Sequence, residues 1–339
     1  MKTLRELVSP YESVSFIGMC KNAGKTTTFN RLIGELREKN ISFAATSVGR
    51  DGESTDLVTN TVKPGIFVYK GTLIATAADL LKYCDITKEF LRTTGIHTPM
   101  GEIVILRALS DGFVQLAGPS MTTQLAEISK DFRSIGAEKI LIDGALGRKS
   151  LCSRKVSQST ILCTGASYHK NMRQVVRDTA FVCELLQLAQ TDITITDEIW
   201  EQNTCKYIPV YTDKPLCLPE EKLIPEKIWR RGQENPPESI VVQGGLTDAM
   251  VKTLVMSNAD LKGKKMILRD GSKILLSSDV YDKLRIKGLS FEVADAIRLL
   301  AVTINPFSAY GFHFDKDEFM NQMTAAINVP VLNVRETTI

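Results

Sequence analysis

Apolar positions recur along the first two hundred residues in short runs that alternate with stretches of helical spacing. Residues 14–17 form one such run, and the helix predicted after it has apolar side chains at positions i, i+3, i+4 and i+7, namely Phe29, Leu32, Ile33 and Leu36. The other strands expected here are 41–48, 66–69, 102–106, 113–116, 139–142 and 159–163, and the other helices are 121–135 and 169–188. Strands that alternate with helices predict a doubly wound, mainly parallel α/β sheet, which binds ligands beyond the carboxyl ends of its strands.

The pattern is interrupted between residues 212 and 239, where Pro215, Pro219, Pro225, Pro236 and Pro237 punctuate a charged segment. Proline cannot continue a helix or a central strand, so we interpret this segment as a linker. The alternation then resumes, with strands expected at 240–242, 265–268 and 299–304 and a helix after Gly245. The sequence therefore predicts a first, doubly wound α/β domain over 1–211, a Pro-rich linker over 212–239 and a smaller α/β domain over 240–339. We also expect 102–106 and 113–116 to pair as a hairpin that turns at 110–112.

Composition supports a water-soluble globular chain of two domains. The 339 residues are 43% hydrophobic and 24% charged, and 42 Lys and Arg against 39 Asp and Glu give a formal charge of +3. This charge is too small to indicate a nucleic-acid partner by itself. The start of the chain lacks a secretory-signal pattern and no apolar run is long enough to span a membrane, so we expect a cytoplasmic protein without a membrane partner. The cysteines and histidines have no spacing typical of metal ligands.

The strongest chemical signal follows the first strand. Gly18 is separated by five residues from Gly24-Lys25-Thr26, which opens the first long helix. A strand, a small-residue turn and a helix that begins on Gly-Lys-Thr are typical of a Walker A phosphate-binding loop, whose backbone N–H groups and helix N-terminus bind phosphate. Lys25 would reach the β- and γ-phosphates, and the Thr26 hydroxyl would bind Mg²⁺. The candidate nucleotide-binding residues are Lys21, Asn22, Ala23, Gly24, Lys25, Thr26 and Thr27.

Two details of this loop depart from familiar patterns. The first glycine of G-x-x-x-x-G-K-[ST] is replaced by Met19, and a glycine stands one residue earlier, at Gly18. Lys21 resembles the additional phosphate-binding lysine of the signal-recognition, Min and biotin-synthesis class of P-loop proteins, in which that lysine lies one residue further upstream. A solvated loop lysine is the alternative interpretation of Lys21, and an ordinary turn that opens a helix is the alternative for the whole motif.

Carboxylates at the ends of predicted strands are candidates for orienting Mg²⁺, which prefers oxygen ligands. Asp143 ends the apolar run 140–142 and precedes Gly144, a Walker B pattern. Asp51 follows the second strand, where an acidic residue in the same P-loop class contributes to Mg²⁺ or positions the attacking group, and Glu53 is the reserve. We take Lys25, Asp51 and Asp143 as candidate catalytic groups and Thr26, Asp143 and Asp51 as candidate metal ligands. Turn formation is the alternative role of both aspartates.

The identity of the nucleotide rests on an absent motif. No [NT]-K-x-D stretch, which recognises guanine through an aspartate, occurs in the sequence. We therefore expect ATP, with Mg²⁺, rather than GTP.

Several stretches together resemble a known family. They are residues 18–27, 95–102, 115–120 and 140–150, and they are similar to the P-loop subunit of the reactivase for lysine 5,6-aminomutase, an adenosylcobalamin enzyme of anaerobic lysine fermentation. The resemblance covers the first 200 residues, and the remainder only by length and order. It implies a P-loop ATPase in which Gly24, Lys25 and Thr26 bind ATP and Asp143 lies near the metal. It also implies two partners: a second, mismatch-repair-ATPase-like reactivase subunit, and the aminomutase whose damaged cobalamin the pair removes.

Two other functions fit the same motifs. An ATP-dependent small-molecule ligase or kinase similar to dethiobiotin synthetase would use the Asp51 loop and residues 98–102 to bind an acceptor substrate. A nucleotide-binding scaffold would bind ATP without turnover. A ligase should turn over with a small acceptor alone, whereas a reactivase should hydrolyse little ATP until its partners are present.

Overall fold

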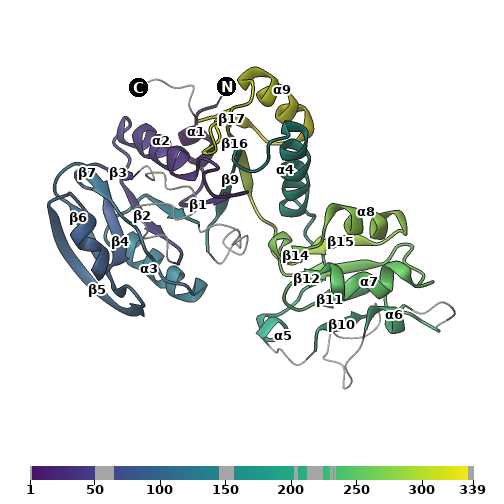
Figure 1. The fold of residues 1–339 in the computed structure, drawn as a ribbon. Coiled ribbons are helices and arrows are strands. Elements are labelled where there is room, and N and C mark those ends of the chain that lie inside the picture. The colour runs from purple at the N-terminus through teal and green to yellow at the C-terminus, as the bar shows by residue number, and fades with distance from the viewer. Residues whose placement is uncertain are drawn as a thin grey trace. The chain divides into compact units, whose positions relative to one another are not determined.

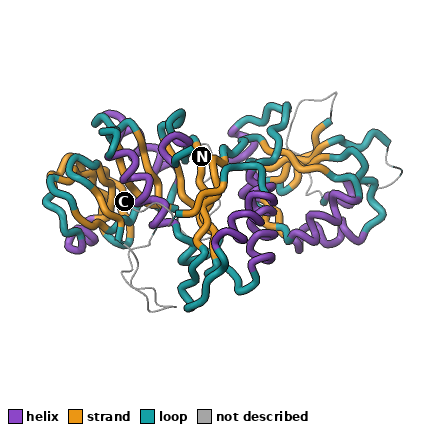
Figure 2. Tube along the Cα trace, turned by 90° about the horizontal axis from the view of Figure 1, so that it is seen from above, coloured by secondary structure: helices purple, strands orange, loops and turns teal. Residues whose placement is uncertain are grey.

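The structure is a computed structural model that describes residues 2–49, 65–144, 156–201, 205–211, 224–229, 232 and 234–334. The chain folds into two compact units (Figure 1). The first unit combines Met1–Ala180 with Arg298–Ile339, and the second is Phe181–Ile297. In both units helices flank the strands of a sheet, as Figure 2 shows in purple and orange.

The first unit contains a nine-stranded sheet in the order β17-β16-β9-β1-β8-β2-β4-β6-β5. Its strands are β1 (Ser13–Gly18), β2 (Phe43–Ser47), β4 (Leu73–Ala77), β5 (Lys88–Thr98), β6 (Gly101–Ala108), β8 (Lys139–Asp143), β9 (Ser159–Gly165), β16 (Leu299–Asn305) and β17 (Val331–Asn333). A separate antiparallel pair is formed by β3 (Ile66–Val68) and β7 (Gly112–Val114). The helices are α1 (Leu4–Val8), α2 (Lys25–Arg37), the 3-10 helix η1 (Ala78–Tyr83), α3 (Thr122–Ser134), α4 (Met172–Leu186), whose last turns belong to the second unit, and α9 (Lys316–Ala326).

The sheet is mostly parallel. Every neighbouring pair from β17 to β4 is parallel, whereas β6 runs antiparallel to both β4 and β5. The prediction of an α/β fold with a mainly parallel sheet is therefore confirmed. Because the strands from β17 to β4 share one direction, their carboxyl ends meet at one edge of the sheet.

Both faces of the central strands are covered. Leu141 of β8 packs into a core cluster with Phe29, Leu32 and other side chains of α2. Its neighbours Ile140 and Ile142 point to the opposite face, because side chains alternate along a strand, and both are buried as well. Figure 1 shows α2 and α3 on opposite sides of these strands.

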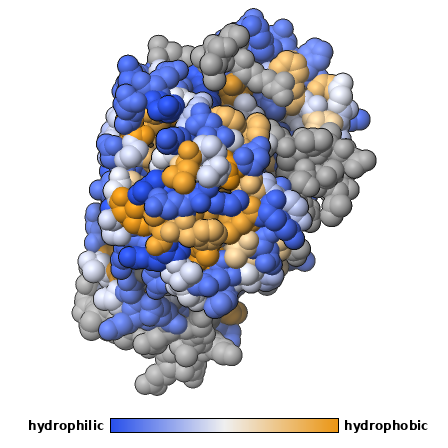
Figure 3. Space-filling model, turned by 90° about the vertical axis from the view of Figure 1, so that its left-hand side faces the viewer, coloured by the Kyte–Doolittle hydropathy of each residue, from blue (hydrophilic) through white to orange (hydrophobic). Residues whose placement is uncertain are grey.

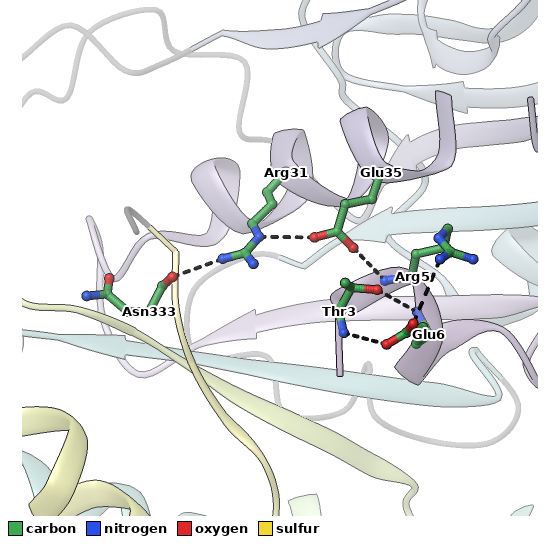
Figure 4. A network of polar contacts seen from close by, with 6 residues as sticks. All are labelled: Thr3, Arg5, Glu6, Arg31, Glu35 and Asn333. Carbon is green, nitrogen blue, oxygen red and sulfur yellow. Dashed lines mark hydrogen bonds and ion pairs between the residues drawn. The ribbon is translucent and has the colours of Figure 1, made fainter. Parts of the chain in front are cut away.

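A polar network holds α2 in place (Figure 4). The Arg31 guanidinium donates to the Glu35 carboxylate at 3.1 Å and to the Asn333 backbone carbonyl, in β17, at 2.9 Å. The other oxygen of the Glu35 carboxylate accepts from the Arg5 backbone N–H of α1 at 2.7 Å. Thr3 and Glu6 form a reciprocal capping box that begins α1. Residues near the two ends of the chain thus hold the same helix.

The prediction that 102–106 and 113–116 pair as a hairpin is wrong. The strand β6 pairs with β4 and β5, and β7 pairs with β3. The Asp111 side chain, in the expected turn, accepts from the Lys70 backbone N–H at 2.7 Å, which joins the turn to the end of β3 rather than closing a β6–β7 hairpin.

Strand β5 was not predicted, because it forms the edge of the sheet and lacks an apolar run. Most of its side chains are exposed or half-buried, so no alternation of apolar and polar positions marks it. Apolar side chains nevertheless gather on this side of the first unit, as Figure 3 shows. Phe90 of β5 is 60% exposed, and Leu109 and Phe113 are 42% and 48% exposed.

The second unit is a smaller α/β fold with a four-stranded sheet in the order β10-β11-β13-β15. Its elements are α5 (Asp197–Glu201), β10 (Tyr207–Val210), α6 (Pro225–Ile228), β11 (Ser239–Val242), β12 (Leu246–Thr247), α7 (Asp248–Met256), β13 (Lys265–Leu268), the 3-10 helix η3 (Gly271–Lys273), β14 (Ile274–Leu275), α8 (Ser278–Ile286) and β15 (Ser290–Val293). Strands β11, β13 and β15 are parallel, and β10 is antiparallel to β11. A small parallel pair, β12 with β14, lies beside them.

The expected domain boundaries are wrong in three places. Residues 181–211, predicted to belong to the first domain over 1–211, belong to the second unit. Residues 298–339, predicted to belong to a separate domain over 240–339, belong to the first unit, because β16 pairs with β9 and β17 pairs with β16. The segment 212–239 is not wholly a linker: Trp229 is 1% exposed in the core of the second unit, and its indole N–H donates to the Pro237 carbonyl at 2.9 Å. Residues 212–223 lie outside the described residues.

No helix among the described residues is long and apolar enough to cross a lipid bilayer.

The assignment of β16 to the first unit can be tested by unfolding. Ile304→Ala removes a fully buried side chain of β16 and should destabilise the first unit by about 2–5 kcal/mol. Both tryptophans, Trp200 and Trp229, belong to the second unit, so tryptophan fluorescence follows that unit whereas circular dichroism follows both. We expect the dichroism transition to shift to lower temperature more than the fluorescence transition does.

The matched control is Ile286→Ala, because Ile286 lies in the second unit and is 85% exposed. It should leave both transitions nearly unchanged. A shift of Ile304→Ala confined to the fluorescence transition would assign β16 to the second unit instead.

Candidate functional site

The turn between β1 and α2 lies near the middle of the nine-stranded sheet and has the backbone of a tight loop. Asn22 and Gly24 have φ angles of 60° and 94°, in the left-handed region that glycine and asparagine tolerate best. Gly24 is the N-cap of α2 and offers no side-chain cap to the first helical turn. Of the predicted loop residues, Ala23 is buried and Lys21 is exposed. The N-terminus of α2 therefore opens at the carboxyl end of β1.

The displaced glycine of the motif has a clear structural role. A Cβ added to Gly18 would lie 3.2 Å from both Cγ and Cδ of Lys25. The aliphatic part of Lys25 thus lies over the last residue of β1, and any larger residue at position 18 would crowd it. Gly18 stands one residue before the usual place of the first glycine of the motif. Because it has no side chain, it leaves the space that the Lys25 side chain occupies.

Asp143 ends the strand beside this loop. β8 lies between β1 and β2, with Asp143 in register with Phe16 on one side and Ser47 on the other. The Val48 backbone N–H donates to the Asp143 carbonyl at 3.0 Å, and the Gly144 N–H donates to the Phe16 carbonyl at 2.9 Å. The predicted strand-ending carboxylate is therefore at the carboxyl edge, one strand from the turn that holds Lys25.

The charges around the turn affect the pKa values of two nearby thiols, Cys163 and Cys20. Burial raises the pKa of the Cys163 thiol, its hydrogen bonds with Thr303 and Thr28 lower that pKa, and Lys25 lowers it whereas Asp143 raises it. Burial raises the pKa of Cys20 to about 11, and the Lys25 ammonium opposes this rise. Both thiols are therefore protonated near neutral pH. Lys25 and Asp143 are close enough to influence the same buried group.

Hydroxyl groups fix the first turn of α2 to the sheet. The Gly24 carbonyl accepts from the Thr28 backbone N–H at 2.9 Å and from the Thr28 hydroxyl at 3.0 Å. The Thr28 hydroxyl also shares a 3.0 Å hydrogen bond with Thr303 of β16, and both side chains are buried. Thr26 and Thr27 are half-buried in the same turn. Sequence reasoning did not identify Thr28, because a buried threonine in a helix gives no distinctive signal.

A second loop reaches this edge from the other side of β8. The Gly118 N–H donates to the Ser47 hydroxyl at 3.0 Å, and a Cβ on Gly118 would lie only 1.8 Å from the Ser47 carbonyl oxygen. The Ala77 N–H donates to the Ala117 carbonyl at 2.9 Å. Residues 115–120 therefore cross the carboxyl ends of β2 and β4, and only glycine permits the close approach at position 118.

The turn between β5 and β6 lies at the same edge. β6 is antiparallel to β4, and Ile103, near its start, is in register with Ala77, the last residue of β4. The Asp79 N–H donates to the Met100 carbonyl at 3.1 Å. The four segments 18–27, 95–102, 115–120 and 140–144 therefore all border one edge of the sheet.

The loops after β9 and β16 complete the edge. Asn305, the last residue of β16, is 8% exposed, and its side-chain amide lies 3.5 Å from the Asn22 carbonyl, the long limit of a hydrogen bond. Its backbone carbonyl accepts from the Ala166 N–H at 2.9 Å. The Tyr168 hydroxyl donates to the Asp178 carboxylate at 3.1 Å, and burial, followed by that carboxylate, raises the pKa of Tyr168. Asn305 was missed, although it ends an apolar run as Asp143 does.

Asp51 and Glu53, predicted to help bind the metal, lie outside the described residues. Within the part of the chain that the structure describes, no three His, Cys, Asp or Glu side chains gather as a metal site would require. The hydroxyl of Thr26 and the carboxylate of Asp143 are oxygen donors, the kind that a hard dication such as Mg²⁺ accepts.

Comparison with protein-family models, with curated proteins and with solved structures finds no match to the chain.

Proposed function

We propose that the protein binds Mg-ATP at the turn between β1 and α2 and acts as the ATP-dependent subunit of a reactivating factor for an adenosylcobalamin-dependent aminomutase. The observation that carries the nucleotide site is the placement of Lys25, folded over Gly18 at the end of β1 and one strand from Asp143. A fixed positive charge, an open helix N-terminus and a neighbouring carboxylate suit a metal-bound phosphate chain.

Each group would have a distinct role toward the nucleotide. The backbone N–H groups of residues 21–27 and the positive end of α2 would bind phosphate oxygens without the cost of desolvating a side chain. Lys25 would neutralise charge at the β- and γ-phosphates. Thr26 would ligate Mg²⁺, and Asp143 would orient it directly or through water. Bound Mg²⁺ would stabilise charge that develops on the phosphates during hydrolysis.

ATP is the nucleotide that we favour. The sequence holds no [NT]-K-x-D stretch for reading guanine.

The reactivase role is supported by the common location of the segments that resemble that family. The described parts of all four border the edge that contains Lys25 and Asp143, although they come from distant parts of the sequence. An aminomutase that loses its adenosyl group retains inactive cobalamin in a buried site, so release requires a conformational change. Binding and hydrolysis of ATP can drive such a change by ordering and releasing loops around the γ-phosphate.

The same edge of the sheet also fits the alternative function, that of a ligase or kinase. In a ligase or kinase similar to dethiobiotin synthetase, an acceptor substrate would lie beyond the γ-phosphate, over the carboxyl ends of β2 and β4 and the start of β6. The loops 98–102 and 115–120 occupy that side. The alternative differs from the reactivase in what triggers turnover.

One prediction of this proposal concerns the metal. Asp143→Asn keeps the shape of the side chain but removes its charge, so it should leave nucleotide binding in chelator unchanged and abolish most of the additional affinity that Mg²⁺ confers. Titration calorimetry with and without Mg²⁺ measures both quantities. The control is Asp131→Asn, because Asp131 pairs with Arg92 near the end of α3, away from the carboxyl edge. Equal Mg²⁺ dependence in wild type and Asp143→Asn would leave Asp143 with a structural role only.

Another prediction of this proposal concerns activity. With its partner subunit, Mg-ATP and fresh adenosylcobalamin, the protein should restore an aminomutase inactivated by turnover, and its ATP hydrolysis should rise when both partners are added. A non-hydrolysable analogue or Lys25→Ala should prevent the recovery. Turnover with a small acceptor alone would favour the ligase or kinase. Aminomutase activity that recovers both with the non-hydrolysable analogue and with Lys25→Ala would contradict an ATP-driven role.

A further inference from the structure

The loop after β16 holds aromatic side chains out into solvent beside the candidate nucleotide site. Phe307 is 45% exposed and Tyr310 is 60% exposed, and His313 is exposed as well. The Phe307 and His313 rings lie side by side, with centroids 6.1 Å apart and an interplanar angle of 33°. Aromatic rings held on the surface lose the stabilisation that burial would give them, so their exposure calls for an explanation.

The loop is ordered by its own backbone. Phe307 and His313 form an antiparallel bridge, the Ser308 N–H donates to the Phe312 carbonyl at 2.9 Å, and the Phe314 N–H donates to the Pro306 carbonyl at 2.9 Å. This small hairpin has Tyr310 near its tip. Its aromatic side chains are thus presented by a defined backbone rather than by an unstructured loop.

Two contacts fix the hairpin to the carboxyl edge of the sheet. The Phe307 N–H donates to the Asn305 side-chain oxygen at 3.2 Å, and the Ala309 N–H donates to the Ser167 hydroxyl, in the loop after β9, at 3.0 Å. Asn305 in turn lies close to the turn after β1, because a Cβ added to Gly24 would be 3.2 Å from the Asn305 Cβ. The aromatic hairpin and the candidate phosphate site therefore share Asn305.

The order of the strands sets the direction of a bound nucleotide. β8, with Asp143, lies on one side of β1, and β9 and β16 lie on the other. If the terminal phosphate and its metal face Asp143, the nucleoside extends toward β9 and β16. Two strand spacings separate β1 from β16, roughly 10 Å, which is close to the reach of a nucleotide from its phosphates to its base.

We propose that Phe307, Tyr310 and His313 form a stacking wall for the base of the nucleoside triphosphate. The inference rests on the proposed nucleotide site and adds the group that distinguishes a nucleotide from a bare phosphate chain. Every base has a flat π-face, so aromatic rings bind it through stacking without reading its edge. The hairpin thereby supplies affinity for the nucleoside, whereas Lys25 and the backbone of the turn supply affinity for the phosphates.

The experiment compares two ligands that differ only in the nucleoside. Mg-ATP and inorganic triphosphate with Mg²⁺ are titrated by calorimetry into wild type, Phe307→Ala, Tyr310→Ala and Phe307→Leu. Loss of a stacked aromatic ring should weaken Mg-ATP binding by about 5- to 150-fold and leave triphosphate binding within twofold of wild type. Phe307→Leu keeps apolar bulk but lacks a π-face, so it should behave like Phe307→Ala, whereas Phe307→Tyr should restore ATP affinity. Triphosphate binding also shows that each variant is folded.

The matched control is Phe90→Ala, because Phe90 is 60% exposed on β5, the strand at the other end of the sheet. It should bind both ligands as wild type does. Unchanged ATP affinity in Phe307→Ala and Tyr310→Ala would overturn the inference. An equal loss of affinity for ATP and triphosphate would also overturn it, because the hairpin would then support phosphate binding rather than base binding. A wild-type chain that binds triphosphate as tightly as ATP would also overturn it. A wild-type chain that binds neither ligand would reject the nucleotide site itself, and the stacking wall with it.

Discussion

The position of β1 between parallel neighbours is the constraint on which the rest of the site depends. With β8 on one side and β9 on the other, β1 delivers the turn of residues 19–24 to the middle of the carboxyl edge. Parallel strands require crossover connections, so residues from distant parts of the chain end at this edge. The buried hydroxyls of Thr28 and Thr303 then fix the first turn of α2 to β16. The geometry around Lys25 is therefore set by the sheet, and the loop alone does not determine it.

This arrangement separates the edge into two sides. On the side of β8 and β2 lie Asp143 and the loop that contains Gly118. On the side of β9 and β16 lie Asn305 and the aromatic hairpin that follows it. Under our proposal the first side would contain the metal and whatever the γ-phosphate acts upon, and the second would contain the nucleoside. A partner or an acceptor that responds to the γ-phosphate would therefore meet the protein over β2, β4 and β6.

The sequence predicted the parts of the fold that carry local signals. Strands β1 and β8 are short apolar runs bounded by glycine, and α2 has a regular apolar stripe, so all three were expected close to their observed bounds. The edge strand β5 was not, because its exposed side chains leave no periodic pattern. The return of β16 to the first sheet could not be predicted either, since pairing between β16 and β9 joins residues far apart in the sequence. Motifs single out Lys25 and Asp143 as candidates, whereas Asn305 and Thr28 make contacts that only the fold creates.

The central claim is that the turn between Gly18 and Lys25 binds the phosphates of ATP, and titration calorimetry of Mg-ATP into Lys25→Ala tests it most directly. Removal of one charge-assisted contact costs about 1.5 to 3 kcal/mol, so affinity should fall by about ten- to hundredfold while the unfolding transition stays in place. Lys39→Ala, an exposed lysine just beyond the other end of α2, should bind Mg-ATP as wild type does. Equal affinity of wild type and Lys25→Ala for Mg-ATP would contradict the account.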